Sequence, residues 1–112
     1  MQSFANMYAS LSVKQRKRLE EKVQEYIKAL DQAIAQILSP TIGRSEDQFL
    51  ITDELIPLYG VGPSPEEAMA DYRSVVVEYY ESLEEDTEEL GRSLREQLEV
   101  LRRVFSLVEK VS

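Results

Sequence analysis

The most constraining feature of this 112-residue chain is a run of apolar residues spaced alternately four and three positions apart. The run consists of Leu19, Val23, Tyr26, Leu30, Ala33 and Ile37. This spacing is that of a heptad repeat, which aligns side chains along one face of an α-helix and needs a second helix to cover them. We therefore expect a long N-terminal helix within residues 1–39, with a helical partner along that face.

The limits of this helix are marked by two residues. Ser12 is a suitable N-cap, and Pro40 disfavours helical geometry in the residue before it, so the helix should end near Ser39. Residues 1–11 are either further helical turns or a leader outside the helix, and both alternatives stay open. Their apolar residues are Phe4, Met7, Tyr8 and Leu11.

The middle of the chain is predicted to form a short β-hairpin over residues 48–62. Its expected strands are 49–52 and 56–61, joined by a turn at Asp53-Glu54 and ended by Gly62-Pro63. Residues 43–48 are interpreted as a polar connector. Because Pro57 has no N–H to donate, its position in the second strand should face a sheet edge.

Two helical patterns follow the hairpin. Ser64-Pro65-Glu66-Glu67 has the residues of a capping box with proline at the first helical position, and it opens an expected helix over 64–85. Apolar residues then repeat from Leu90 to Val108, which predicts a helix over 87–111. We favour a break between Glu85 and Gly91, although one bent helix is the alternative. The fold class expected is α+β and mostly α, in a single domain of residues 1–112.

These elements do not form an obviously self-sufficient unit. A two-stranded hairpin is barely stable alone in water, and the heptad face needs a cover. The last helix could supply that cover within the chain, or a second copy could supply it. We therefore expect an interface with another polypeptide, either a second copy or a different protein. The residues expected at that interface are Leu19, Val23, Tyr26, Leu30, Ile37, Phe49, Ile51, Leu58, Tyr59, Leu98, Leu101 and Phe105.

The residue types argue against catalysis. The chain contains no histidine and no cysteine, which removes the commonest general base, the usual metal ligand and thiol nucleophiles. No glycine-rich phosphate loop is present. The acidic stretch 84–88, followed by Glu96 and Glu99, resembles the magnesium-binding motifs of MazG-type pyrophosphohydrolases, but the second motif lacks its aspartate. We expect an exposed acidic face, no enzyme and no cofactor.

The distribution of charge favours a protein partner over nucleic acid. The net charge is −8, and residues 64–91 hold ten acidic side chains and one basic side chain. Such a surface repels nucleic acid and attracts basic protein surfaces. The basic residues at 14–18 and 102–103 are interpreted as solvated charges. Without a long apolar run, a basic signal or cysteine, the expected location is the cytoplasm, with no membrane contact.

Within residues 49–83, a turn and helix start at Gly62-Pro63-Ser64-Pro65-Glu66-Glu67-Ala68 is followed by Tyr72-Arg73 and Glu78-Tyr79-Tyr80. With these residues, the segment 49–83 resembles part of the HicB-type antitoxin domain. It implies a non-catalytic αβ unit that pairs through its sheet and neutralises a small basic ribonuclease toxin. In this chain the family's first strand is short, helical residues 84–111 replace the strand after the helix, and a C-terminal DNA-binding motif is missing. The alternative is a structural or adaptor protein that self-assembles through its long helices as a homodimer.

Overall fold

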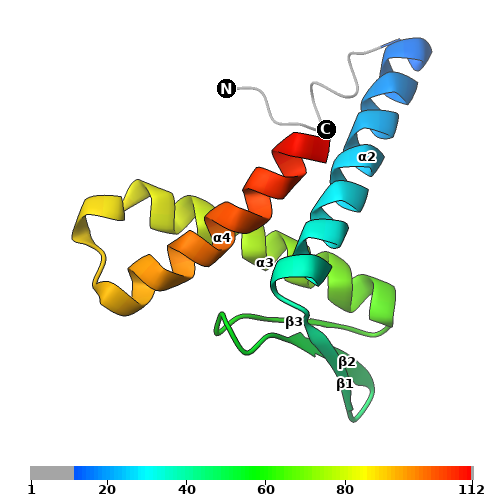
Figure 1. The fold of residues 1–112 in the computed structure, drawn as a ribbon. Helices are drawn as coiled ribbons and strands as arrows, with labels where there is room; N and C mark the ends of the chain where they lie inside the picture. The colour runs from blue at the N-terminus through cyan, green and yellow to red at the C-terminus, as the bar shows by residue number, and fades with distance from the viewer. Residues whose placement is uncertain (1–11, 112) are drawn as a thin grey trace.

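The computed structural model describes residues 12–111, which form long helices beside a three-stranded antiparallel sheet (Figure 1). The expectations for residues 1–11 lie outside the described residues. The α+β, mostly α class is confirmed, with a long N-terminal helix, then strands, then two C-terminal helices. The elements in order are α2 (Val13–Ile37), β1 (Thr41–Ser45), β2 (Gln48–Thr52), β3 (Tyr59–Gly62), α3 (Pro65–Glu85), the 3₁₀ turn η1 (Thr87–Glu89) and α4 (Arg92–Val111).

Helix α2 begins and ends where its sequence predicts. The Ser12 hydroxyl accepts the N–H of Gln15 at 3.2 Å, and the Gln15 side chain accepts the N–H of Ser12 at 3.0 Å. This reciprocal capping box satisfies two backbone donors at the helix start. At the other end, Ser39 takes a left-handed backbone conformation with a φ of 51° immediately before Pro40, which ends the helix.

The sheet contains one more strand than the predicted hairpin. β1 pairs with β2 through a turn at Glu46-Asp47, and β2 pairs with β3, so the strand order is β1-β2-β3. The prediction of a polar connector at 43–48 is therefore wrong. Every side chain of β1 is exposed, so the strand has no buried, alternating apolar face and is held by backbone pairing.

The last strand is also shorter than predicted. β3 begins at Tyr59 and not at Ile56, whose side chain is fully buried in the loop between β2 and β3. Pro57 lies in the same loop, so the edge position expected for it does not arise. Ile56 anchors this loop to the core, which explains why an apolar residue there does not extend the strand.

Helix α3 covers one face of the sheet at very close range. A Cβ added to Gly62 would lie 2.6 Å from the backbone nitrogen of Ala68, and a Cβ added to Gly60 would meet the backbone nitrogen of Tyr72. The two glycines are therefore required by packing, because any side chain there would push the helix away. The hairpin is thus stabilised within the chain, by α3 and by β1.

The start of α3 differs from the predicted capping box. The Ser64 hydroxyl accepts the N–H of Glu67 at 3.2 Å, as expected of an N-cap. The Glu67 carboxylate, however, accepts a hydrogen bond from that same hydroxyl at 3.2 Å instead of from the backbone of Ser64. The cap is formed, but without the reciprocal half of the box.

The break predicted between Glu85 and Gly91 is confirmed. The Thr87 hydroxyl donates to the Glu84 carbonyl at 2.8 Å, η1 follows, and the chain turns back into α4. In Figure 1, α4 then rises across α3 and reaches α2. Helix α4 covers the C-terminal half of the α2 heptad face. For that half, the expected helical partner therefore lies within the same chain.

The core lies where α2, α3 and α4 meet above the sheet. Two ion pairs tie the helices together at its margin: Arg73 of α3 with Asp31 of α2 at 3.0 Å, and Arg102 of α4 with Glu84 of α3 at 2.9 Å. Buried core residues include Leu30, Ile34, Ile56, Tyr72, Val76, Leu98, Leu101 and Val104.

Candidate protein-interaction surfaces

The residues expected to contact a partner separate into three groups in the structure. Leu30, Ile51, Leu98 and Leu101 are buried, where other elements of the same chain cover them, so the structure assigns these four to the core and not to an interface. Val23, Tyr26 and Tyr59 are exposed. The partly buried remainder is Leu19, Ile37, Phe49, Leu58 and Phe105, and Phe105 stacks on Tyr80 with ring centroids 4.3 Å apart.

The first candidate surface is the face of the sheet turned away from α3, here called the outer face. The register pairs Leu50 with Val61 and Thr52 with Tyr59, which places these four side chains together on the outer face. Tyr59 is 62% exposed, Val61 is 37% exposed and Leu50 is partly buried. In Figure 1 the helices lie on the other side of the sheet, so no described helix covers this apolar strip.

Acidic residues bound the outer face at both ends of its strands. Glu46 and Asp47 form the β1–β2 turn, and Glu54 is exposed in the β2–β3 loop at the opposite end, whereas the neighbouring Asp53 carboxylate lies near the buried hydroxyl of Tyr72. Burial raises the pKa of the Asp53 carboxyl, although the hydrogen bond from the Leu55 N–H opposes that shift. The surroundings of the strip are therefore net negative.

The basic residue of the sheet faces the other way. Arg44 lies over the ring of Phe49 with its guanidinium carbon 5.5 Å from the ring centroid. The register pairs these two residues on the face opposite Leu50, so this cation–π contact does not neutralise the outer face. A partner that approaches the outer face meets apolar side chains first and carboxylates at the ends.

The second candidate surface is the uncovered half of the α2 heptad face. Val23 is 38% exposed and Tyr26 is 41% exposed, and Leu19 is only partly buried. In Figure 1 this half of α2 extends beyond α4. The same face, which is buried at Leu30 and Ala33, is thus open toward the N-terminus.

A groove between α2 and α3 continues this open face. It has a volume of about 430 Å³, and its apolar lining includes Tyr26, Ile27, Leu30, Ala70 and Val77, with Glu78 at its margin. Burial, and then the nearby Glu81 carboxylate, raise the pKa of the Tyr26 phenol, so its hydroxyl stays neutral. Arg73 and Glu78 both line the groove, which therefore offers an apolar floor bordered by charges of both signs.

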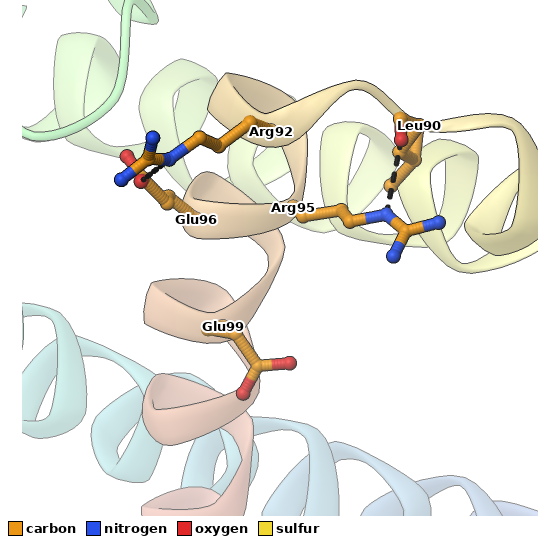
Figure 2. A pocket seen from close by; sticks show the side chains of 5 residues that line it. All are labelled: Leu90, Arg92, Arg95, Glu96 and Glu99. Atoms are coloured by element: carbon orange, nitrogen blue, oxygen red, sulfur yellow. Dashed lines mark hydrogen bonds and ion pairs between the residues drawn. The ribbon is translucent and has the colours of Figure 1, made fainter.

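A further hollow lies at the start of α4. Figure 2 shows Arg92 bonded to Glu96 at 3.3 Å and the Arg95 Nε donating to the Leu90 carbonyl at 3.0 Å. Glu99, which completes the lining, pairs with Arg102 at 2.9 Å. The charged groups of this hollow of about 420 Å³ are exposed and largely paired with one another, so they do not converge on a ligand position.

The acidic turn between α3 and α4 was the alternative site for magnesium. Its first carboxylate, Glu84, accepts two hydrogen bonds from Arg102, at 2.9 and 3.2 Å, and these hold the pKa of Glu84 below its ordinary value. Among residues 12–111, no group of three or more carboxylates, histidines or cysteines is arranged to hold a metal ion. Glu84 instead serves to join α3 to α4.

Comparisons with protein-family models, with curated protein sequences and with solved structures found no match to this chain. The HicB-type resemblance of residues 49–83 therefore stays a prediction. Within the described part of the chain, none of the helices has the length and apolarity needed to cross a membrane.

Sequence reasoning missed Leu50 and Val61 as members of the outer face. The signal that could have identified them is the alternation Tyr59-Gly60-Val61-Gly62. Glycines at every second position indicate that one face of a strand lies against another backbone, which leaves the side chains between them on the opposite face.

Proposed function

We propose that the protein is a non-catalytic protein-binding module that receives a small basic protein on the outer face of its sheet. The observation that carries this proposal is the exposure of Tyr59 and Val61 side by side with Leu50, on a sheet face that no described helix covers. A contiguous exposed apolar strip with a polar rim is typical of protein-interaction sites, and a tyrosine is a favoured anchor in them.

Charge supports the choice of a basic partner. The chain carries a net charge of −8, and carboxylates stand at both ends of the outer face. Opposite charge around an apolar centre speeds the encounter of two proteins and disfavours partners of the wrong sign. A basic protein would therefore approach this face faster than a neutral protein of the same size.

The HicB-type resemblance supports the same proposal and narrows the proposed role from a general protein-binding module to an antitoxin-like one. In this chain the segment that carries the resemblance runs from β3 through Gly62 and Ser64 into α3, which is the junction that holds the outer face in place. The proposed role is that of an antitoxin-like module that neutralises a small basic toxin. The cytoplasmic location expected from the cysteine-free sequence is part of the proposal.

The proposal is tested with the full chain as bait in extracts of its native host. The double variant Tyr59→Lys with Val61→Lys keeps the fold, because both side chains are exposed, but places positive charge where the basic partner should dock. Ile42→Lys is the matched control, since Ile42 is 54% exposed on the opposite face of the same sheet. Retained proteins are identified by mass spectrometry, purified and titrated against each variant by calorimetry.

We expect one small basic protein to bind the wild type and the Ile42→Lys control with similar affinity. The double variant should bind at least about tenfold more weakly, because like charges then face each other across the interface. Equal binding by all three proteins, or retention of acidic partners only, would overturn the proposal.

A self-assembling adaptor is the second candidate function, and the uncovered half of the α2 heptad face favours it. The two roles are compatible, because the N-terminal half of α2 and the outer face lie at opposite ends of the molecule (Figure 1). A stable self-dimer that retains no other protein from the host would support the adaptor role over the antitoxin-like role.

A further inference from the structure

We infer that a second copy of this chain pairs with the open edge of β1, in an antiparallel β1–β1 contact whose twofold axis passes through Gly43. β1 is the terminal strand in the order β1-β2-β3, so no strand among residues 12–111 pairs with its outer edge. In Figure 1 the β1–β2 hairpin extends away from the helices at its turn. An uncovered strand edge presents backbone N–H and C=O groups that can pair with another chain.

The hydrogen bond between Val61 and Asp71 fixes which backbone groups of the sheet point outward. Directly opposite residues of an antiparallel pair alternate between hydrogen-bonded and non-bonded pairs. The Val61 N–H points away from β2, because it donates to Asp71 of α3. Its partner in the register, Leu50, therefore directs its own backbone groups toward β1, where they bond Gly43.

The residues on either side of Gly43 consequently face the free edge. Ile42 and Arg44 direct their N–H and C=O groups away from β2, because the alternation along β1 gives them no bonds to that strand. The side chain of Ile42 is 54% exposed and that of Arg44 is also exposed, so neither is covered by a helix. Each copy therefore offers two outward residues for pairing.

Packing within one copy does not explain the glycine at position 43. A Cβ added there would meet nothing within 4 Å, and the φ of Gly43 is not positive. A glycine inside a strand weakens it and often marks the close approach of another backbone. Gly60 and Gly62 have this role toward α3 within the chain. By the same reasoning, Gly43 marks the approach of a backbone from outside the chain.

The residues of β1 select one register for twofold pairing. With the axis at Gly43, Ile42 lies opposite Arg44 of the second copy, so both outward residues of each strand are used. Each such pair exchanges two hydrogen bonds. An axis at Arg44 would place two like charges opposite each other. An axis at Ile42 would place Arg44 against Pro40, which has no N–H to donate.

The β1–β1 contact does not depend on the function proposed above. Directly opposite residues of an antiparallel pair share a face, so the two outer faces lie on the same side of the joined sheet and stay open. The dimer is therefore tested with the isolated chain. Failure of the dimer leaves the binding of a basic protein untouched, and failure of that binding leaves the dimer untouched.

The first test uses cysteine cross-linking, since the chain has no cysteine of its own. Gly43→Cys places two thiols at the axis, where Cα atoms of a non-bonded pair lie about 4.5 Å apart, within disulfide range. Ile42→Cys is the matched control, because the two Ile42 positions would be diagonal neighbours about 7–8 Å apart, beyond that range. Both variants are oxidised at the same low concentration and followed by non-reducing electrophoresis.

The second test removes one outward N–H from each copy. Ile42→Pro should keep the monomer fold, because this N–H does not bond β2 and proline is tolerated where its position faces a sheet edge. Circular dichroism checks that fold. Ile42→Thr is the control, since it keeps the N–H and a β-branched side chain. Masses of the wild type and both variants are measured by sedimentation equilibrium.

We expect the wild type and Ile42→Thr to be dimers. Ile42→Pro should dimerise at least about tenfold more weakly, because the dimer then loses two hydrogen bonds and the proline rings obstruct the edge. Gly43→Cys should form the disulfide-linked dimer at least about tenfold faster than Ile42→Cys, because only its thiols lie within bonding distance.

Four results would overturn the inference. The first is a wild type that stays monomeric at high concentration. The second is a folded Ile42→Pro variant that dimerises as well as the wild type, and the third is cross-linking of Gly43→Cys no faster than that of Ile42→Cys. The fourth is a monomer in which the Ile42 and Arg44 amides exchange slowly with solvent, because another segment of the same chain would then occupy the edge.

Discussion

The Asp71 carboxylate of α3 accepts a hydrogen bond from the backbone N–H of Val61 at 2.9 Å. Since β3 is an edge strand, its outward N–H groups would otherwise be open to pairing with a strand of another molecule. The same helix that packs on Gly60 and Gly62 thus also closes part of the β3 edge. Binding through the flat outer face is then favoured over extension of the sheet at this edge.

Loss of the Asp71 carboxylate should destabilise the protein and open this edge. For Asp71→Ala we expect the free energy of unfolding to fall by about 1–2 kcal/mol, because the Val61 N–H loses a charged acceptor. Asp71→Asn, which keeps an acceptor oxygen, should recover most of the loss. Urea unfolding measures the stability, and light scattering measures any added aggregation. Equal destabilisation by Ala and Asn would contradict this role of the hydrogen bond.

A side chain added at Gly60 should destabilise the fold, whereas a side chain added at Gly43 should not. Gly60→Ala forces a methyl group into the backbone of α3, and we expect it to cost about 2–3 kcal/mol or more. Gly43→Ala is the matched control, because an added Cβ there meets nothing within 4 Å. It should be neutral or stabilise β1 by up to about 1 kcal/mol. A thermal melt in which both variants behave alike would refute the close packing of α3 on β3.

The hydroxyls of Tyr72 and Tyr79, two of the three tyrosines of α3, should contribute differently to the stability of the fold. The Tyr72 hydroxyl is buried and has no hydrogen-bond partner among the described residues, and burial, then the nearby Asp53 carboxylate, raise its pKa. Tyr72→Phe should therefore be neutral or stabilising by up to about 1–2 kcal/mol. Tyr79 donates to the Gln97 side chain of α4, so Tyr79→Phe should cost about 0.5–1.5 kcal/mol. Chemical unfolding of both variants checks the order; a larger loss for Tyr72→Phe would contradict it.

The link between α3 and α4 should weaken in acid. Hydrogen bonds from Arg102, with a smaller contribution from Tyr80, hold the pKa of Glu84 below its ordinary value of 4.5. Because the pKa of Glu84 is lower in the folded state than in the unfolded state, its ionised carboxylate stabilises the fold at pH values above the unfolded-state pKa. This stabilisation is lost as the pH falls through the lower folded-state pKa. The melting temperature should therefore fall below about pH 4.5.

Glu84→Gln isolates this contribution. The variant should melt at a lower temperature than the wild type at neutral pH and approach it as the pH falls below the ordinary glutamate pKa. Glu85→Gln is the control, because Glu85 is an exposed neighbour and it is Glu84 that pairs with Arg102 of α4. A constant difference between Glu84→Gln and the wild type across this pH range would show that the ion pair is not the cause.

Much of the helical fold was predictable, because its signals are local. Ser12 and Pro40 bound α2, Ser64 begins α3, and Gly91 lies in the break before α4. These residues act through backbone geometry and capping within one or two turns, so a single sequence is enough to locate them.

The sheet and the interaction surfaces were harder to predict, because they depend on contacts distant in sequence. Every side chain of β1 is exposed, so this strand depends on its backbone pairing with β2. Leu98 and Leu101 have the same heptad pattern as Val23, yet they are buried and Val23 is exposed. Periodicity identifies a face that needs a cover, but the crossing of α4 over α2 decides which residues receive it.

The most direct test of the proposed binding surface is a nuclear magnetic resonance titration of the isotope-labelled chain with the small basic protein that it retains. We predict shift changes at the amides of Leu50, Thr52, Tyr59 and Val61, and little change at Leu19 and Val23 on α2. Shift changes confined to α2 or α4, or no binding of a basic protein at all, would contradict the account.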